Sequence, residues 1–229
     1  SAGRLSVGGK SPLTQGIKEA NAGGMAGDKL GHLGLKAIVV EGQPTEDGLY
    51  LLHVTPQGAS LLPADELSGL GNYETVARLQ ERFGQDVAIV SIGPAGEMGL
   101  AGAGVAVTDD LTKQPGRLAA RGGLGAVMGS KKLKAIVLRG KERPQYYDRG
   151  DFRRYVKESN TWIKENSIGL TQFGTAGGVP GAEMYGHIPL QNWRMGSWPE
   201  GASKISGQVV HETIWVKHTY CFACPIGCG

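Results

Sequence analysis

The stretch Leu35-Lys36-Ala37-Ile38-Val39-Val40-Glu41-Gly42 recurs almost unchanged as Leu133-Lys134-Ala135-Ile136-Val137-Leu138-Arg139-Gly140. The same shift also superposes three glycines upstream of each stretch, namely Gly24 on Gly122, Gly27 on Gly125 and Gly31 on Gly129. Each copy therefore reads as a glycine-rich loop, a short helix and a buried strand. Two such copies predict an α+β fold, a pseudo-twofold duplicated β-sheet platform whose halves present equivalent loops.

Further elements are expected between the two copies. Alternating apolar residues predict a strand over 48–54, and a second strand is expected over 87–92. An apolar stripe at helical spacing predicts a helix over 73–83, with Asn72 as its N-cap and Gly84 ending it.

The character of the chain changes after Gly140. Residues 151–167 have the pattern of an amphipathic helix, with Phe152, Tyr155, Val156 and Trp162 expected on its inward face. A boundary near 141–150 predicts two domains, a platform domain over 1–145 and the start of a mostly helical domain over 146–229.

Composition excludes several classes of protein. The net charge of +3 over 229 residues is too small and dispersed to indicate a nucleic-acid surface. The longest apolar runs are strand-sized, so no membrane span is expected, and the start Ser1-Ala2-Gly3-Arg4 lacks the apolar region of a signal peptide. The 38 glycines gather in loops, where backbone N–H groups can approach a ligand with phosphates.

All three cysteines lie in the last nine residues, as Cys221, Cys224 and Cys228. Convergent thiolates select zinc, copper(I) or an iron–sulfur centre. The odd count and short spacing argue against disulfides and indicate a reducing compartment, which predicts a cytoplasmic protein. Three interpretations stay open at this point: an iron–sulfur cluster, a Cys3His zinc site completed by His218, and inert thiols.

Taken one at a time, the other polar residues have ordinary structural roles or lie in solvent. Single arginines are more often solvated or ion-paired than phosphate ligands, and Glu97 reads as a carboxylate that closes a turn. Lys131, Lys132 and Lys134 read as a charge cluster at the C-terminus of a helix. No histidine has an activating partner in the sequence, so no catalytic residue is predicted.

Five segments together resemble one family. They are Lys10-Ser11-Pro12-Leu13-Thr14, Asn21-Ala22-Gly23-Gly24, residues 91–97 (S-I-G-P-A-G-E), residues 121–131 (R-G-G-L-G-A-V-M-G-S-K) and residues 224–229 (C-P-I-G-C-G). In this order they look like the tungsten-containing aldehyde ferredoxin oxidoreductase family. The resemblance implies oxidation of an aldehyde to a carboxylic acid at a tungsten bis-pyranopterin (molybdopterin) centre, with electrons passing through a [4Fe-4S] cluster to ferredoxin.

The resemblance also assigns residues. It implies that the two pterin phosphates are bound by Arg4 and Arg117, and that the backbone carbonyls of Asn21 and Leu118 hold a bridging magnesium ion. The neighbouring cofactor positions are Ala22, Gly23, Ala120 and Arg121, where Ala22 and Ala120 replace residues that are often serine and glycine in the family. Cys221, Cys224 and Cys228 match the cluster ligands.

The same resemblance implies partners and missing parts. The expected partners are an aldehyde substrate and ferredoxin or an iron–sulfur electron-transfer subunit, and a homo-oligomer is left open. The family's N-terminal strands, fourth cluster cysteine, D-x-x-G-L pterin motifs and substrate cavity would lie outside these residues, so the chain reads as a fragment. The alternatives are a structural zinc-binding module and a family branch that reduces aromatic thioesters.

Overall fold

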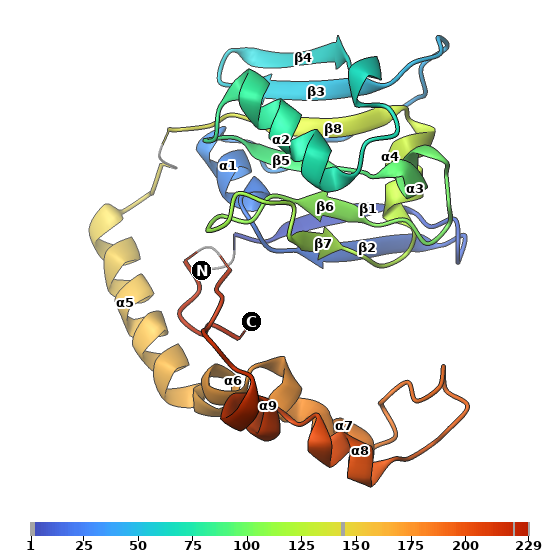
Figure 1. The fold of residues 1–229 in the computed structure, drawn as a ribbon. Helices are drawn as coiled ribbons and strands as arrows, with labels where there is room; N and C mark the ends of the chain where they lie inside the picture. Colours follow the sequence, from blue (N-terminus) through green and yellow to red (C-terminus); the bar gives the residue numbers. More distant parts are fainter. Residues whose placement is uncertain (1–2, 143–144, 222, 229) are drawn as a thin grey trace. The chain divides into compact units, whose positions relative to one another are not determined.

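The structure, a computed structural model, describes residues 3–142, 145–221 and 223–228. Contacts within the chain divide it into two compact units, Ala2–Gln145 and Tyr146–Gly229. The first unit combines strands with helices, and the second is helical in its described part (Figure 1). The predicted α+β class is confirmed.

A six-stranded mixed sheet forms the centre of the first unit. Its strands follow the order β4-β3-β8-β5-β6-β7, in which β3 and β8 are parallel and all other neighbours are antiparallel. The bounds are β3 Tyr50–Thr55, β4 Gly58–Pro63, β5 Ala88–Ser91, β6 Val105–Val107, β7 Arg117–Ala119 and β8 Leu133–Leu138.

The two faces of this sheet bury different apolar clusters, because successive side chains of a strand point to opposite faces. On one face Ile89 and Val137 pack with Val76 and Leu79 of α2 (Asn72–Phe83), which crosses that face in Figure 1. The short helix η1 (Asp65–Leu67) adds Leu67 to the same cluster.

On the other face of the sheet lie the remaining elements of the two repeat copies. Here Val90 and Leu138 pack with residues of a separate antiparallel pair, β1 (Leu5–Lys10) and β2 (Ile17–Ala22). Two seven-residue helices, α1 (Ala26–His32) and α4 (Leu124–Ser130), complete this cluster. A third short helix, α3 (Pro94–Glu97), follows β5 and packs against α4.

The two copies of the repeat form different secondary structure. The predicted helices form at equivalent positions, and the second copy forms the predicted buried strand β8. The strand predicted over 35–42 is wrong: this stretch has no strand hydrogen bonding, and Val39 is 79% exposed. A strand needs a neighbour for its backbone groups, and no described strand pairs with 35–42.

The second unit contains short helices after one long one. Their bounds are α5 Arg149–Asn166, α6 Ile168–Phe173, η2 Thr175–Gly178, α7 Val179–Met184, α8 Pro199–Lys204 and α9 Gly207–Thr213. The inward face predicted for α5 is wrong, because Phe152, Tyr155, Val156 and Trp162 are all at least 40% exposed. None of its side chains is buried by the described residues.

Three smaller predictions also need correction. Helix α2 begins at Asn72 with Gly71 as its N-cap in an extended conformation, while Asn72 Oδ1 accepts a hydrogen bond from Ser91 Oγ at 3.0 Å. Lys134 does not belong to the charge cluster expected at a helix C-terminus, since it lies on β8, is fully buried and pairs with Glu97. Glu97, expected to close its own turn, instead accepts from the Gly69 N–H at 2.8 Å and pairs with Lys134, so its carboxylate joins segments that lie far apart in the sequence.

Among the described residues, no helix has both the length and the apolar character required to cross a bilayer.

Candidate functional site

Two equivalent strand–turn–helix connections form the candidate site in the first unit. One runs from β2 through Gly23 and Gly24 into α1, and the other runs from β7 through Gly122 and Gly123 into α4. Gly24, Gly122 and Gly123 have φ values of 96°, 76° and 69°, a left-handed backbone that side chains with a Cβ rarely adopt. The sequence needs glycine here because the chain reverses sharply between strand and helix.

The two turns are held by segments of the opposite copy. The N–H of Met25 donates to the carbonyl of Thr108, just after β6, at 2.9 Å, and Gly24 packs directly against the same carbonyl. In the other direction, Gly123 packs against the Pro12 ring, and β2 lies beside β7 (Figure 1). The candidate residues on β2 and β7 are thereby brought to one region of the unit.

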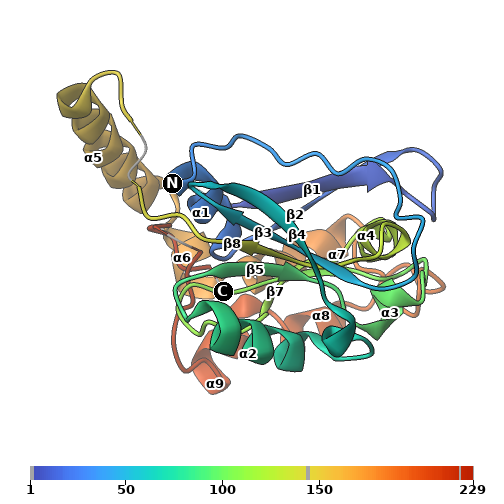
Figure 2. The same ribbon diagram turned by 90° about the horizontal axis from the view of Figure 1, so that it is seen from above.

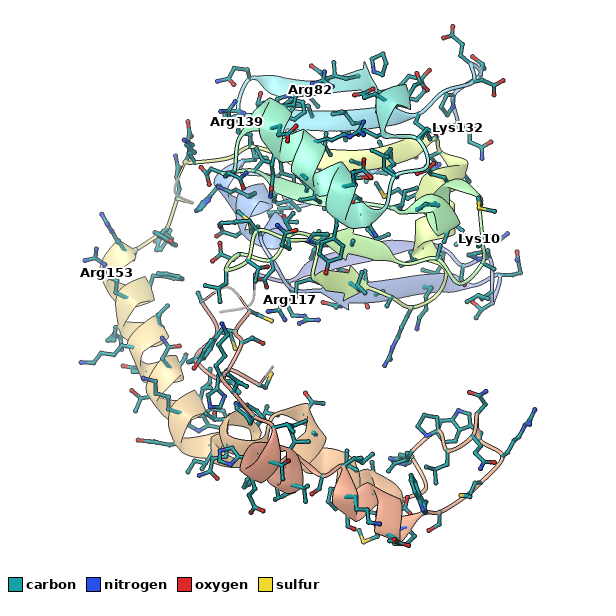
Figure 3. All side chains as sticks on the ribbon, in the orientation of Figure 1. Lys10, Arg82, Arg117, Lys132, Arg139 and Arg153 are labelled. Carbon is teal, nitrogen blue, oxygen red and sulfur yellow. The ribbon has the colours of Figure 1, made fainter. Side chains whose placement is uncertain are left out.

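Arg117 has a well-defined setting on β7, at the edge of the six-stranded sheet (Figure 3). Its Nε donates to Asp109 Oδ2 at 2.6 Å, while Asp109 Oδ1 accepts from the N–H groups of Leu111 and Thr112 at 3.0 and 3.1 Å. Burial alone would raise the pKa of Asp109, but these hydrogen bonds and the guanidinium charge outweigh it and hold that pKa below its ordinary value. Asp109 is therefore ionised at neutral pH and fixes the orientation of Arg117.

Exposure divides the other candidates into two groups. Asn21, Leu118, Ala120 and Arg121 are exposed, whereas the side chain of Ala22 and the backbone of Gly23 are buried. In the described part of the chain β2 and β7 each pair on one side only, so half of their backbone groups are not engaged in a sheet.

Arg4 belongs to the first turn by position. It directly precedes Leu5, which faces Ala22 in the β1–β2 register, and α1 packs at Gly27 against the backbone of Arg4. The structure thus groups Arg4 with residues 21–23 on one copy, and Arg117 with residues 118–121 on the other.

The predicted cysteine ligands lie in the second unit, whereas the predicted magnesium ligands Asn21 and Leu118 lie in the first. Cys221, Cys224 and Cys228 are partly buried, and the Cys224 N–H donates to the Cys221 carbonyl at 3.0 Å. Within the described residues no group of three or more cysteine, histidine or acidic side chains is arranged around a common point. The three thiols share one short loop but not one centre.

The side chain of His218 joins the two ends of the cysteine loop. Its Nδ1 lies 2.9 Å from the Gly227 carbonyl, so this nitrogen carries the proton and donates, and Gly227 takes φ 67° packed against the Tyr220 ring. The ring of His218 also contacts Trp215, with centroids 5.0 Å apart. The Nε2 atom retains a lone pair, which is the arrangement common in metal-bound histidines.

Sequence reasoning missed Asp109 and Lys18. Asp109 orients Arg117, and Lys18 packs against Gly122 so closely that a Cβ there would collide with its side chain. A signal for Asp109 was present, since Ser11 and Asp109 occupy equivalent positions of the repeat and both precede a Leu-Thr pair by two residues.

Comparison with known proteins identifies the class. A family model described as the aldehyde ferredoxin oxidoreductase N-terminal domain matches residues 1–140, and a model of domains 2 and 3 of the same enzyme matches residues 154–229. The chain therefore belongs to the aldehyde ferredoxin oxidoreductase family.

Individual relatives agree with this assignment. The tungsten-containing aldehyde ferredoxin oxidoreductases of Pyrococcus abyssi and Pyrococcus furiosus are 38% and 37% identical over 231 residues, covering 99% of this chain and 37% of each relative. An aliphatic sulfonate oxidoreductase, WOR-like subunit, of Pyrococcus furiosus is 24% identical over 98% of the chain. The chain thus spans 37% of the length of these curated relatives.

One solved structure shares the fold. It is the active site complex BamBC of benzoyl coenzyme A reductase with 1,5-dienoyl-CoA, which matches all of this chain and 36% of its own with a TM-score of 0.74 and 21% identity.

Proposed function

We propose that the full-length protein oxidises aldehydes to carboxylic acids at a tungsten bis-pyranopterin centre and passes the electrons through a [4Fe-4S] cluster to ferredoxin. The duplicated strand–turn–helix unit carries this proposal, because residues that the resemblance assigns to the cofactor lie at its two equivalent connections, Asn21 and Ala22 at the end of β2 and Arg117 and Leu118 on β7. A ligand with two similar anionic halves suits two similar turns.

The residues of the first unit fit such a ligand. Phosphate recognition favours guanidinium groups, whose planar fork forms two parallel hydrogen bonds, and Arg4 and Arg117 would serve one phosphate each. Asp109 presets the orientation of Arg117 before a ligand binds. The backbone carbonyls of Asn21 and Leu118 would supply neutral oxygen donors for magnesium, which prefers oxygen ligands in octahedral geometry.

The small residues at the turns have a separate task. Ala120 is exposed and carries no side chain beyond a Cβ, so a flat ring system could approach the backbone there, whereas Ala22 and Gly23 are buried and would support the turn from beneath. Arg121 is exposed next to Gly122 and would add positive charge beside the second phosphate. When bound, the metal cofactor supplies the two-electron chemistry, in which aldehyde and water yield acid, two electrons and two protons.

The cysteine loop would supply three of the four thiolates that a [4Fe-4S] cluster requires. Cys221, Cys224 and Cys228 share the loop that His218 closes through Gly227, and this closure holds the ends of the loop together. The fourth ligand and the acid or base that acts on the substrate are proposed to lie outside these residues.

Zinc binding is the second candidate, and one observation favours it: His218 donates from Nδ1 and leaves Nε2 free to bind a metal with the three thiolates. In that case the loop is structural and carries no electrons. A branch that reduces aromatic thioesters would use the same platform with another substrate.

Metal and cofactor analysis of the full-length protein, prepared without oxygen, separates these candidates. We expect tungsten and pterin together with iron and sulfide, and aldehyde-dependent reduction of ferredoxin. A protein with zinc as its only metal contradicts the proposal.

Matched variants locate the sites. Replacing Arg117 with alanine should lower the pterin content and leave iron unchanged, while Cys224→Ser should lower iron. Arg153→Ala is the control, since Arg153 is an exposed residue of α5 in the other unit (Figure 3) and should change neither.

A further inference from the structure

A run of aromatic rings leads from the helices of the second unit to the cysteine loop, residues 221–228. The ring of Phe173, in α6, lies with its centroid 5.8 Å from that of His211 in α9. Trp215 follows, with its ring centroid 5.8 Å from that of His211 and 5.0 Å from that of His218. Trp215 and His218 belong to the coil that continues the chain after α9 (Figure 2). This aromatic run connects the cysteine loop to two helices of its own unit.

The side chain of Trp215 is fixed beside the backbone of the cysteine loop. The backbone N–H of Trp215 donates to the Val210 carbonyl of α9 at 3.0 Å. A Cβ added to Gly174 would lie 3.2 Å from the six-membered ring of Trp215 and 3.0 Å from the Cys228 carbonyl. Trp215 and Cys228 therefore both border Gly174, and only a residue without a side chain fits between them.

The indole Nε1–H of Trp215 is a buried hydrogen-bond donor that has no acceptor among the described residues. Buried tryptophans usually pair this group, because an unpaired donor loses its bond to water and gains nothing in return. His218, which touches the Trp215 ring, uses its own Nδ1 to donate to the Gly227 carbonyl. The aromatic run thus brings an unused donor to the cysteine loop.

The sulfur atoms of a metal centre in this loop would be suitable acceptors. A thiol accepts hydrogen bonds only weakly, but cysteines become thiolates when they bind a metal. Hydrogen bonds to the sulfurs are one of the means by which a protein sets the reduction potential of an iron–sulfur cluster. The orphaned donor of Trp215 therefore fits a loop that is completed by a cluster.

We propose that Trp215 donates its Nε1–H to a sulfur atom of the iron–sulfur cluster that Cys221, Cys224 and Cys228 would hold. This inference rests on the proposed function, because it requires a cluster in the loop. An N–H dipole directed at sulfur stabilises the reduced, more negatively charged cluster, so Trp215 raises the reduction potential. His218 ties the loop to the same ring through Gly227.

Pulsed electron paramagnetic resonance of the full-length protein tests the contact directly. In protein that contains ¹⁵N-labelled tryptophan, the reduced cluster should couple to one indole nitrogen, and Trp215→Phe should abolish this coupling. Trp162→Phe is the control, since Trp162 is an exposed residue of α5 and its replacement should leave the coupling unchanged. A reduced cluster that shows no indole coupling, or a coupling that survives in Trp215→Phe, overturns the proposal.

A redox titration measures the consequence of the bond. Trp215→Phe should contain as much iron as the natural protein, and its cluster should have a lower reduction potential. Because phenylalanine is smaller and can loosen the loop, a second variant carries β-(3-benzothienyl)alanine at position 215, which replaces the indole N–H with sulfur and keeps the shape of the ring. Full iron content with an unchanged potential in this second variant overturns the proposal.

Failure of this inference differs from failure of the proposed function. A full-length protein with zinc as its only metal contradicts both. A protein with tungsten and an iron–sulfur cluster, but without the indole coupling, leaves the proposed function intact and removes only the role of Trp215.

Discussion

The two units of this chain differ in how they bury apolar side chains. The first unit encloses two clusters on the two faces of one sheet, in which residues such as Leu51, Val105 and Val137 are fully buried. In the described part of the second unit, Ala202 is the only hydrophobic residue of the core, and large side chains such as Trp162 and Ile214 are exposed. The first unit can therefore be stable from its own contacts, whereas the second has little apolar burial of its own.

The largest expected contrast concerns ion pairs. Lys134 is fully buried, pairs with Glu97 and donates to the Leu70 carbonyl at 2.8 Å. Removing the carboxylate by Glu97→Ala leaves a buried ammonium without its counter-charge, which should cost about 3–5 kcal/mol of unfolding free energy. Protection of the β8 amides from hydrogen exchange in the full-length protein measures this loss.

The matched change in the second unit is Glu200→Ala. Glu200 and Lys204 form an exposed pair at 2.6 Å, with side chains 76% and 69% accessible. Exposed pairs contribute less than about 1 kcal/mol, so amide protection in α8 should change little. Equal losses in the two variants would show that the Glu97–Lys134 pair is open to solvent.

Core truncation should give a similar but somewhat smaller contrast. Leu51 on β3 is fully buried, and Leu51→Ala removes its contacts and leaves a cavity, at a cost of about 2–5 kcal/mol. Leu170 on α6 is 40% exposed, so Leu170→Ala should cost less than about 1 kcal/mol. A large loss at Leu170 would mean that the full-length protein buries this face of α6.

The sequence predicted elements that depend on local patterns and failed where burial or pairing depends on neighbouring segments. Local signals sufficed for the helices α1 and α4, because glycine spacing and apolar periodicity act over a few residues. They failed for 35–42, where an equally apolar stretch has no strand beside it, and for α5, whose apolar stripe is not covered by described residues. Strand formation and burial depend on neighbours that a local pattern does not contain.

The candidate site shows a similar limit. Motifs placed Arg117 and the two glycine turns, but they did not show that each turn rests on the opposite copy, as Met25 does on Thr108. Lys134 was assigned to a charge cluster at a helix C-terminus because its partner Glu97 lies 37 residues away in the sequence. The cofactor roles of Arg4, Asn21 and Leu118 stay predictions.

The smallest expected effect is a dependence of stability on pH that comes from two carboxylates of the first unit. The pKa of Asp86 is lowered chiefly by its hydrogen bond with Lys29, and the pKa of Asp109 is lowered because its hydrogen bonds outweigh the effect of burial. A carboxyl whose folded pKa is depressed stabilises the protein fully above its unfolded pKa, near 3.8, and this contribution disappears as pH falls through the folded value. Acid should therefore weaken amide protection in β5 and β6 below about pH 4.

Asp109→Asn isolates this contribution. The variant keeps the shape of the side chain but not its charge, so it should be less stable by about 1–3 kcal/mol at pH 7 and should lose less stability than the natural protein between pH 6 and pH 3. Asp110→Asn is the control, since Asp110 is a neighbouring, partly exposed carboxylate, 44% accessible, that pairs with Lys113. Parallel pH profiles for the natural protein and Asp109→Asn would mean that Asp109 is not held ionised by Arg117, and that the guanidinium is positioned by other contacts.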